Sequence, residues 1–115
     1  MSAILFQTID WNSVEAVEHP GLTGKAWWRT MQYAGLRIRQ VEYSPGYTAD
    51  HWCQKGHIVH CIAGSLVSEL ETGEAHLLSE GMTYVVTDEA SSHRSVSEHG
   101  ARLLIVDGEF LKGGG

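Results

Sequence analysis

The sequence predicts an all-β fold, on three observations. Apolar residues come in short runs rather than at the spacing of long helices. The 115 residues include 13 glycines, and turn-forming residues separate the apolar runs. Strands recurring every 8 to 12 residues or so are typical of a sandwich or a barrel. The chain has the length of one domain, and either fold can enclose a cavity.

The first 25 residues are less regular than the rest. Asp10 to Ser13 can start a single helical turn, whereas Pro20-Gly21 and Gly24 interrupt any longer element. We therefore expect residues 1–25 to form an irregular arm that packs on the barrel.

Residues 26–110 carry the predicted barrel. The apolar runs predict strands at 26–33, 36–43, 49–53, 57–62, 65–71, 75–79, 82–87, 92–98 and 101–107. Turns are predicted between them at Ala34-Gly35, Ser44-Pro45-Gly46, Ala63-Gly64-Ser65, Thr72-Gly73-Glu74, Glu80-Gly81 and His99-Gly100. Residues 111–115 end in three glycines and are expected to be a disordered tail.

Charge narrows the classes of partner. The formal net charge is −6, from 8 basic and 14 acidic residues, and no basic run occurs. We expect no nucleic acid and no acidic membrane surface as partner, and a small-molecule ligand fits better. The start of the chain lacks the pattern of a signal peptide or membrane span, so we expect a cytoplasmic protein. Its two cysteines, Cys53 and Cys61, should then be thiols.

A cluster of metal-binding residue types lies near the middle of the chain. His51, Cys53 and His57 fall within seven residues, and His93 follows 36 positions after His57. In an extended strand, residues 51 and 53 point to the same face. A tight hairpin at 54–56 would bring His57 back beside them. The alternative is structural: a buried Cys can fill core space, and a His near a turn is often a hydrogen-bonded surface group.

Two stretches carry a resemblance to a known family. Gly46-x4-His51-x-Cys53-x3-His57-x6-Gly64 closely resembles the first cupin motif, which has Gly, then His-x-His, then Glu, then Gly. Gly81-Met-Thr-Tyr-Val-Val followed by His93 is similar to the second motif, although Thr87 stands where Pro is usual, the second Gly is missing and the His lies one residue further on. The resemblance covers residues 36–107.

More narrowly, Asp50-His51-Trp52-Cys53 looks like the signature of the small DHCW-motif cupins, a resemblance that implies no particular activity. It implies a single-domain jelly-roll β-barrel with a metal near its mouth. His51, Cys53, His57 and His93 map onto the ligand positions His, His, Glu and His. Cys53 and His57 therefore replace a His and a Glu, so the family's usual metals cannot be assumed.

Three imidazoles and a thiolate form a soft ligand set. Softness favours Zn(II) among divalent transition metals and leaves Fe(II), Ni(II), Co(II) or copper open. Four ligands would saturate a tetrahedral ion, as in a structural site, whereas three histidines alone would leave open positions. The sequence thus supports a metal-binding module, or a metalloenzyme such as a dioxygenase or isomerase acting on a small oxygen-bearing substrate. It identifies no catalytic residue outside the ligand set.

Residues near the cluster have plainer interpretations. By strand parity, Asp50 and Trp52 face away from His51, and Arg94 faces away from His93. Arg37 and Arg39 share a strand face with Val41 and Tyr43; the guanidinium groups suit carboxylate recognition, but a solvent-facing or inter-subunit role is favoured.

His60 and Cys61 are expected to be structural. His60 should lie in the core or an interface, and Cys61 should fill buried space. A homodimer is expected, with Ile4 to Ile9 and the Trp27-Trp28 pair contributing to the contact.

Overall fold

The computed structural model describes residues 3–112, which form an all-β fold. Nine strands and two short 3-10 helices are assigned in that range. In chain order they are η1 (Trp11–Ser13), β1 (Val17–Pro20), β2 (Lys25–Tyr33), β3 (Leu36–Tyr43), β4 (Tyr47–Thr48), β5 (His57–Leu70), β6 (Ala75–Ser79), β7 (Thr83–Val86), β8 (His93–Ser97), β9 (Ala101–Gly108) and η2 (Glu109–Leu111).

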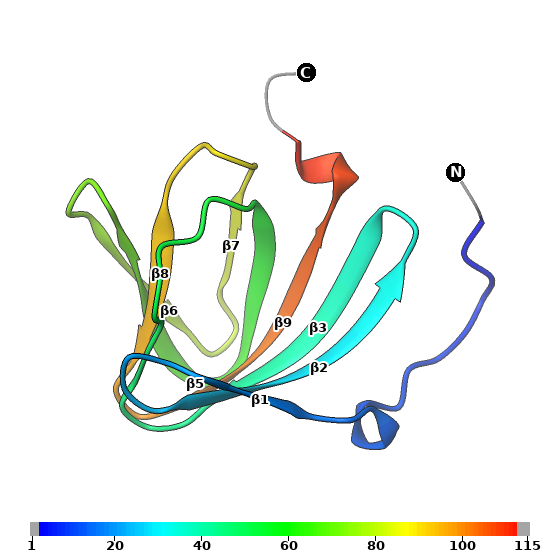
Figure 1. The fold of residues 1–115 in the computed structure, drawn as a ribbon, viewed down its shortest axis with the longest axis horizontal. Coiled ribbons are helices and arrows are strands. Elements are labelled where there is room, and N and C mark those ends of the chain that lie inside the picture. The colour runs from blue at the N-terminus through cyan, green and yellow to red at the C-terminus, as the bar shows by residue number, and fades with distance from the viewer. Residues whose placement is uncertain (1–2, 113–115) are drawn as a thin grey trace.

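Every strand pairing is antiparallel, and the sheet curls into a half-barrel (Figure 1). The main path runs β1-β2-β3-β9-β5-β8-β4, with β6 and β7 also paired to β5. Alternate residues of β3, β5 and β9 face inward and form the core, which includes Val41, Val59, Leu66 and Leu103.

The long strand β5 connects the two halves of the curl. Its first part pairs with β7 and β9, and its later part pairs with β6 and β8. The change of partners occurs at a bulge between Cys61 and Ala63, followed by Gly64 at φ 76°. A side chain at Gly64 would collide with the carbonyl oxygen of Gly100, so the bend requires glycine for both space and backbone angle.

Most predicted strands lie within a residue or two of their observed bounds, but two predictions are wrong. The strands predicted at 57–62 and 65–71 are one continuous strand, β5, which ends at Leu70, because a bulge bends the chain without ending the sheet pairing. Residues 49–53 are not a strand. The paired segment is the short β4, and beyond it only Cys53 makes an isolated bridge.

The predicted hairpin at 54–56 is also wrong. Cys53 pairs with His93 rather than with the strand that begins at His57. The segment from 49 to 56 instead crosses between the halves of the curl, held by Gln54 O accepting from Glu89 N and by Gly56 N donating to Asp88 Oδ1. The backbone groups of Gln54 and Gly56 are thus satisfied by the loop before β8, which leaves no ladder for a hairpin.

The N-terminal segment lies along one edge of the sheet. The helical turn predicted at Asp10 is present as η1, and the Asp10 carboxylate accepts from Asn12 N. Residues 17–20 form β1 against β2, a strand that was not predicted. Before η1 the chain runs outward (Figure 1), and Leu5 and Phe6 are 78% and 98% exposed.

The C-terminal end closes with η2, in which Leu111 is buried and accepts from Asp88 N. Leu111 was assigned to the disordered tail and is instead packed, while residues 113–115 of that tail lie outside the described residues. Within 3–112, no helix is long and apolar enough to cross a membrane.

Candidate metal centre

Cys53, His57 and His93 come together between the two halves of the curl. One ligand atom from each lies within 4.8 Å of the others. His57 opens β5, His93 opens β8, and Cys53 lies on the connecting segment between β4 and β5. Both histidines are buried and the cysteine is half-buried.

Main-chain hydrogen bonds hold two of the three positions. Cys53 N donates to His93 O at 2.7 Å, and His93 N donates to Cys53 O at 3.0 Å. This isolated antiparallel bridge joins the two regions that resemble the cupin motifs. The cysteine and the second-motif histidine are therefore adjacent because of their backbones.

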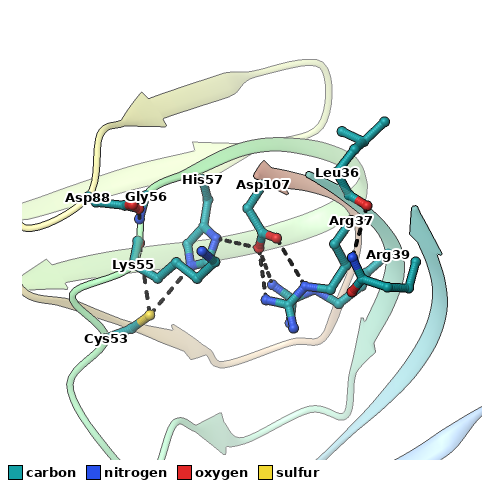
Figure 2. Close-up of polar contacts among 10 residues, drawn as sticks. Leu36, Arg37, Arg39, Cys53, Lys55, Gly56, His57, Asp88 and Asp107 are labelled. Carbon is teal, nitrogen blue, oxygen red and sulfur yellow. Dashed lines mark hydrogen bonds and ion pairs between the residues drawn. The ribbon is translucent and has the colours of Figure 1, made fainter. Parts of the chain in front are cut away.

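His57 is oriented by a carboxylate on a distant strand. Its Nδ1 lies 3.1 Å from Oδ2 of Asp107, and its Nε2 lies 3.4 Å from Sγ of Cys53 (Figure 2). Burial alone would lower the pKa of His57, but the hydrogen bonds with Asp107 and Cys53 outweigh it and the pKa is raised. The Nδ1 proton belongs on the Asp107 side, which directs Nε2 toward the sulfur.

His93 is oriented in the same way by a main-chain group. Its Nδ1 lies 3.0 Å from the carbonyl oxygen of Ser91, which can only accept, so Nδ1 carries the proton. Its Nε2 is buried and has no hydrogen-bond partner among the described residues. A buried unpartnered ring nitrogen with a lone pair is what a metal ligand requires before metal binds.

The thiol completes the set. The hydrogen bond with His57 and, second, the nearby imidazole of His93 lower the pKa of Cys53 to about 5 against the opposing effect of burial. A thiolate is the form that binds a metal or acts as a nucleophile. The donors therefore fit a soft divalent metal: one thiolate, and two imidazoles that each present Nε2.

His51, the fourth predicted ligand, lies outside this group. Its side chain is 76% exposed, and its Nδ1 lies 2.6 Å from Oδ1 of Asp50. Because 49–53 is not a strand, the same-face parity of His51 and Cys53 does not hold. For the same reason, Asp50 lines the same cavity as His51 instead of facing away.

Sequence reasoning missed Asp107, the carboxylate behind His57. Asp107 is 1% exposed and receives hydrogen bonds from Nε and Nη2 of Arg37 and from Nη2 of Arg39. The favoured solvent-facing role of Arg37 and Arg39 is wrong: both point into the half-barrel toward Asp107 (Figure 2). Their shared face with Val41 and Tyr43 was the available signal, since those two residues belong to the core.

A cavity of about 390 Å³ lies beside the three residues. Its walls include the arginines and Cys53, His57 and His93, together with aromatic and apolar side chains from five strands: Trp28, Val41, Tyr43, Tyr47, Tyr84 and Ile105. A second, mostly apolar cavity of about 370 Å³ shares only His93 and Tyr84 with the first. The candidate ligands thus border a space of the size that small molecules occupy.

No protein-family model matches the sequence, and no curated protein matches it either. Solved structures do. The polyketide cyclase RemF from Streptomyces resistomycificus aligns with TM-score 0.74 and 19% identity, over 90% of this chain and 80% of that one.

Two further solved structures share this fold. An RmlC-like cupin from Shewanella frigidimarina aligns with TM-score 0.72 and 13% identity over 90% and 91% of the two chains. A sugar phosphate isomerase of the cupin superfamily from Silicibacter pomeroyi aligns with TM-score 0.69 and 18% identity over 90% and 76%. Identities this low show the fold alone: the chain has the curled antiparallel sheet of the cupin superfamily.

Proposed function

We propose that this protein binds one divalent transition metal, with Zn(II) favoured, through Sγ of Cys53 and Nε2 of His57 and His93. The supporting observation is the buried, unpartnered Nε2 of His93, whose Nδ1 is already engaged by Ser91. A thiolate and two imidazoles suit Zn(II) better than the harder Fe(II) or Mn(II). The DHCW stretch, residues 50–53, supports placing the chain among the DHCW-motif cupins, and the free thiols suit the reducing cytoplasm.

Three protein donors leave a tetrahedral ion one open position. That position would take water, a ligand from the cavity, or His51 after movement of residues 49–56. A bound metal would supply Lewis-acid polarisation of an oxygen ligand. The protein's own part is to hold the donors: Asp107 and Ser91 fix the two rings, and the Cys53–His93 bridge fixes the main chain.

Elemental analysis of protein purified without a metal-affinity step tests the proposal. We expect about one equivalent of metal per chain, lost together with thermal stability on chelation, because a ligand that binds only the folded state stabilises it. The matched variants are His93→Ala, which removes a donor, and His76→Ala, which removes an exposed histidine of β6. Metal content below about a tenth of an equivalent, with no change in melting temperature after adding Zn(II), would contradict the proposal.

A second candidate function is catalysis on a small oxygen-bearing substrate. The observation that favours it is the cavity beside an incomplete donor set, because a purely structural zinc site is normally closed by four protein ligands. X-ray absorption of the metal-loaded protein distinguishes the two: an oxygen donor in the first coordination shell favours the enzyme, and a fourth protein donor favours the binding module.

A further inference from the structure

The guanidinium groups of Arg37 and Arg39 line the cavity, and the single carboxylate of Asp107 does not pair with all of their donors. The side chain of Arg39 is 6% exposed and that of Arg37 is 27% exposed. Arg37 meets Asp107 with two parallel hydrogen bonds. Among the described residues, Arg39 donates only through Nη2, and its buried Nε has no partner. Buried polar groups in proteins are nearly always paired, so this arginine retains capacity for another acceptor.

A structural role explains only part of this arrangement. Asp107 needs a cation nearby to remain ionised and orient His57, and the bidentate contact of Arg37 already provides one. A second arginine adds desolvation cost, and burial together with the charge of Arg37 lowers the pKa of Arg39. Arg39 therefore has more donors than the interior acceptors require.

The charges inside the cavity do not balance either. Arg37 and Arg39 face the single carboxylate of Asp107, and a divalent metal would face the single thiolate of Cys53. The remaining charged groups in the lining are Asp50, Lys55 and Arg94, of which Arg94 pairs with Glu69 outside the cavity. Once metal is bound, the lining carries an excess of about two positive charges.

Aromatic rings form the rest of the wall. The Arg39 guanidinium lies 4.6 Å from the ring centroid of Trp28, whose ring stacks on His19 at 3.8 Å. Tyr43 and Tyr47 stack at 4.3 Å in the same cavity. Stacked rings with buried arginines suit a flat apolar body that carries a negative group.

We propose that the cavity binds a small organic carboxylate with a flat, unsaturated or aromatic body. Its carboxylate lies toward Arg37 and Arg39, and a second oxygen on the same molecule reaches the open metal position. The second contact and the excess of positive charge rest on the proposed metal function, whereas the unpaired Nε of Arg39 does not. The proposal gives Arg37 and Arg39 the role of selecting the anion.

Calorimetric titration with salicylate and with its uncharged analogue salicylamide tests the proposal on zinc-loaded protein. Salicylate should bind at least about tenfold more tightly, because charge-assisted hydrogen bonds are roughly twice as strong as neutral ones. Arg39→Gln should weaken salicylate at least about tenfold and change salicylamide by less than about twofold. Arg39 is the residue to change because it holds the unpaired donor, and because Asp107 keeps its contacts with Arg37 and His57.

Arg102→Gln is the matched control. It removes the same charge from an arginine that is 53% exposed and pairs with Glu42, outside the cavity lining. Salicylate affinity should be unchanged in this variant. Zinc content of every variant is measured first, so that a lost metal is not mistaken for a lost anion contact.

The outcomes separate the two proposals. Equal affinities for salicylate and salicylamide in the zinc-loaded parent would overturn the anion site and leave the metal proposal standing; this comparison needs no variant. Equal effects of Arg39→Gln and Arg102→Gln would also overturn it. Salicylate binding that depends on Arg39, in a parent that takes up no zinc, would support the anion site while the metal proposal fails.

Discussion

Nδ1 of His57 and Oδ2 of Asp107 lie 3.1 Å apart although 50 residues separate them in the chain. The contact joins the start of β5 to the end of β9, and it connects a candidate metal ligand with the buried Arg39 and the partly buried Arg37. The partner that orients the candidate ligand His57 is therefore part of an ionic cluster formed by Asp107, Arg37 and Arg39. The effects of this cluster on metal affinity and on stability can both be measured.

Asp107→Asn should destabilise the metal-free protein by about 3–5 kcal/mol, because it leaves the buried guanidinium of Arg39 and the partly buried one of Arg37 without their counter-charge. Burial alone would raise the pKa of Asp107, but hydrogen bonds from His57 and Arg37 and the charge of Arg39 lower it from 3.8. Its stabilisation is therefore complete above about pH 4 and is lost as pH falls further. Urea unfolding from neutral to acid pH should show that loss in the parent and a flatter profile in the variant.

The same variant should bind Zn(II) about 10 to 100 times more weakly, since the outer partner of a ligating histidine contributes at that level. Competition with a chelator of known affinity measures this. Glu42→Gln, an exposed carboxylate paired with Arg102, is the control. Parallel acid profiles for parent and Asp107→Asn, or equal zinc affinities, would contradict the role assigned to Asp107.

His51→Ala should retain about one equivalent of Zn(II), with an affinity close to that of the parent. His57→Ala and His93→Ala should each lower the affinity for Zn(II) by more than about a hundredfold. The physical reason is distance and exposure: His51 points to Asp50 at the surface, and the other two meet at Cys53. Elemental analysis after dialysis against dilute Zn(II) measures the zinc that each variant retains. A His51→Ala protein that loses its metal would return His51 to the ligand set and indicate that residues 49–56 move on binding.

The regular strands could be predicted because their alternation is local. Leu36 to Tyr43 reads as a strand on its own residues, and its observed bounds agree. The segment from 49 to 53 also carries strand-forming residues, but a strand requires a continuous ladder with a neighbour. Its main chain meets β8 only where Ala49 N donates to Ser95 O and where Cys53 and His93 form their isolated bridge. No local pattern contains that information.

The candidate site likewise contains residues that could be predicted from the sequence and one that could not. Cys53, His57 and His93 were named from residue type and spacing, and the fold brings them together. Asp107 gave no local signal, because its importance depends on a contact with a strand far away in the sequence. Its position at the end of the inward series Ala101, Leu103 and Ile105 was the one indication that a carboxylate would be buried.

Cys53 should react with iodoacetamide quickly in metal-free protein and slowly in the zinc form. Its pKa of about 5 lies below the ordinary 9.0, so the thiolate should persist from neutral pH down to about pH 5. Burial raises the pKa of Cys61, which should stay unreactive in both forms and serves as the internal control. Peptide mass spectrometry measures each site. Equal rates at Cys53 with and without zinc would remove it from the ligand set.

Gly64→Ala should destabilise the fold by at least about 2 kcal/mol, because alanine would adopt an unfavourable positive φ and also meet the carbonyl of Gly100. Gly73→Ala is the matched control: Gly73 has φ 99°, but nothing lies within 4 Å of an added Cβ. Only the backbone cost of about 1 kcal/mol should then apply. Equal losses in thermal or urea unfolding would show that the bend of β5 has room for a side chain.

The exposed arm should contribute to a homodimer. Leu5 and Phe6 are 78% and 98% exposed in the single chain, an exposure that association would reduce. Light scattering should report a dimer for the parent and a monomer for Leu5→Ser with Phe6→Ser. Leu77→Ser, which removes a 59% exposed side chain from β6, should leave the dimer intact. A parent that is monomeric at all workable concentrations would refute the expectation.

The paired hydrogen bonds between Cys53 and His93 use only peptide groups. Residues other than proline, which lacks the N–H that each position donates, could stand here while the same two hydrogen bonds hold the main chain. The type of donor atom at residues 53 and 93 can therefore change, whereas the arrangement of the two backbones stays the same. Single substitutions at residues 53 and 93 can thus exchange thiolate, imidazole and carboxylate donors in the candidate site, and with them the metal that such a site would favour, while the architecture stays constant.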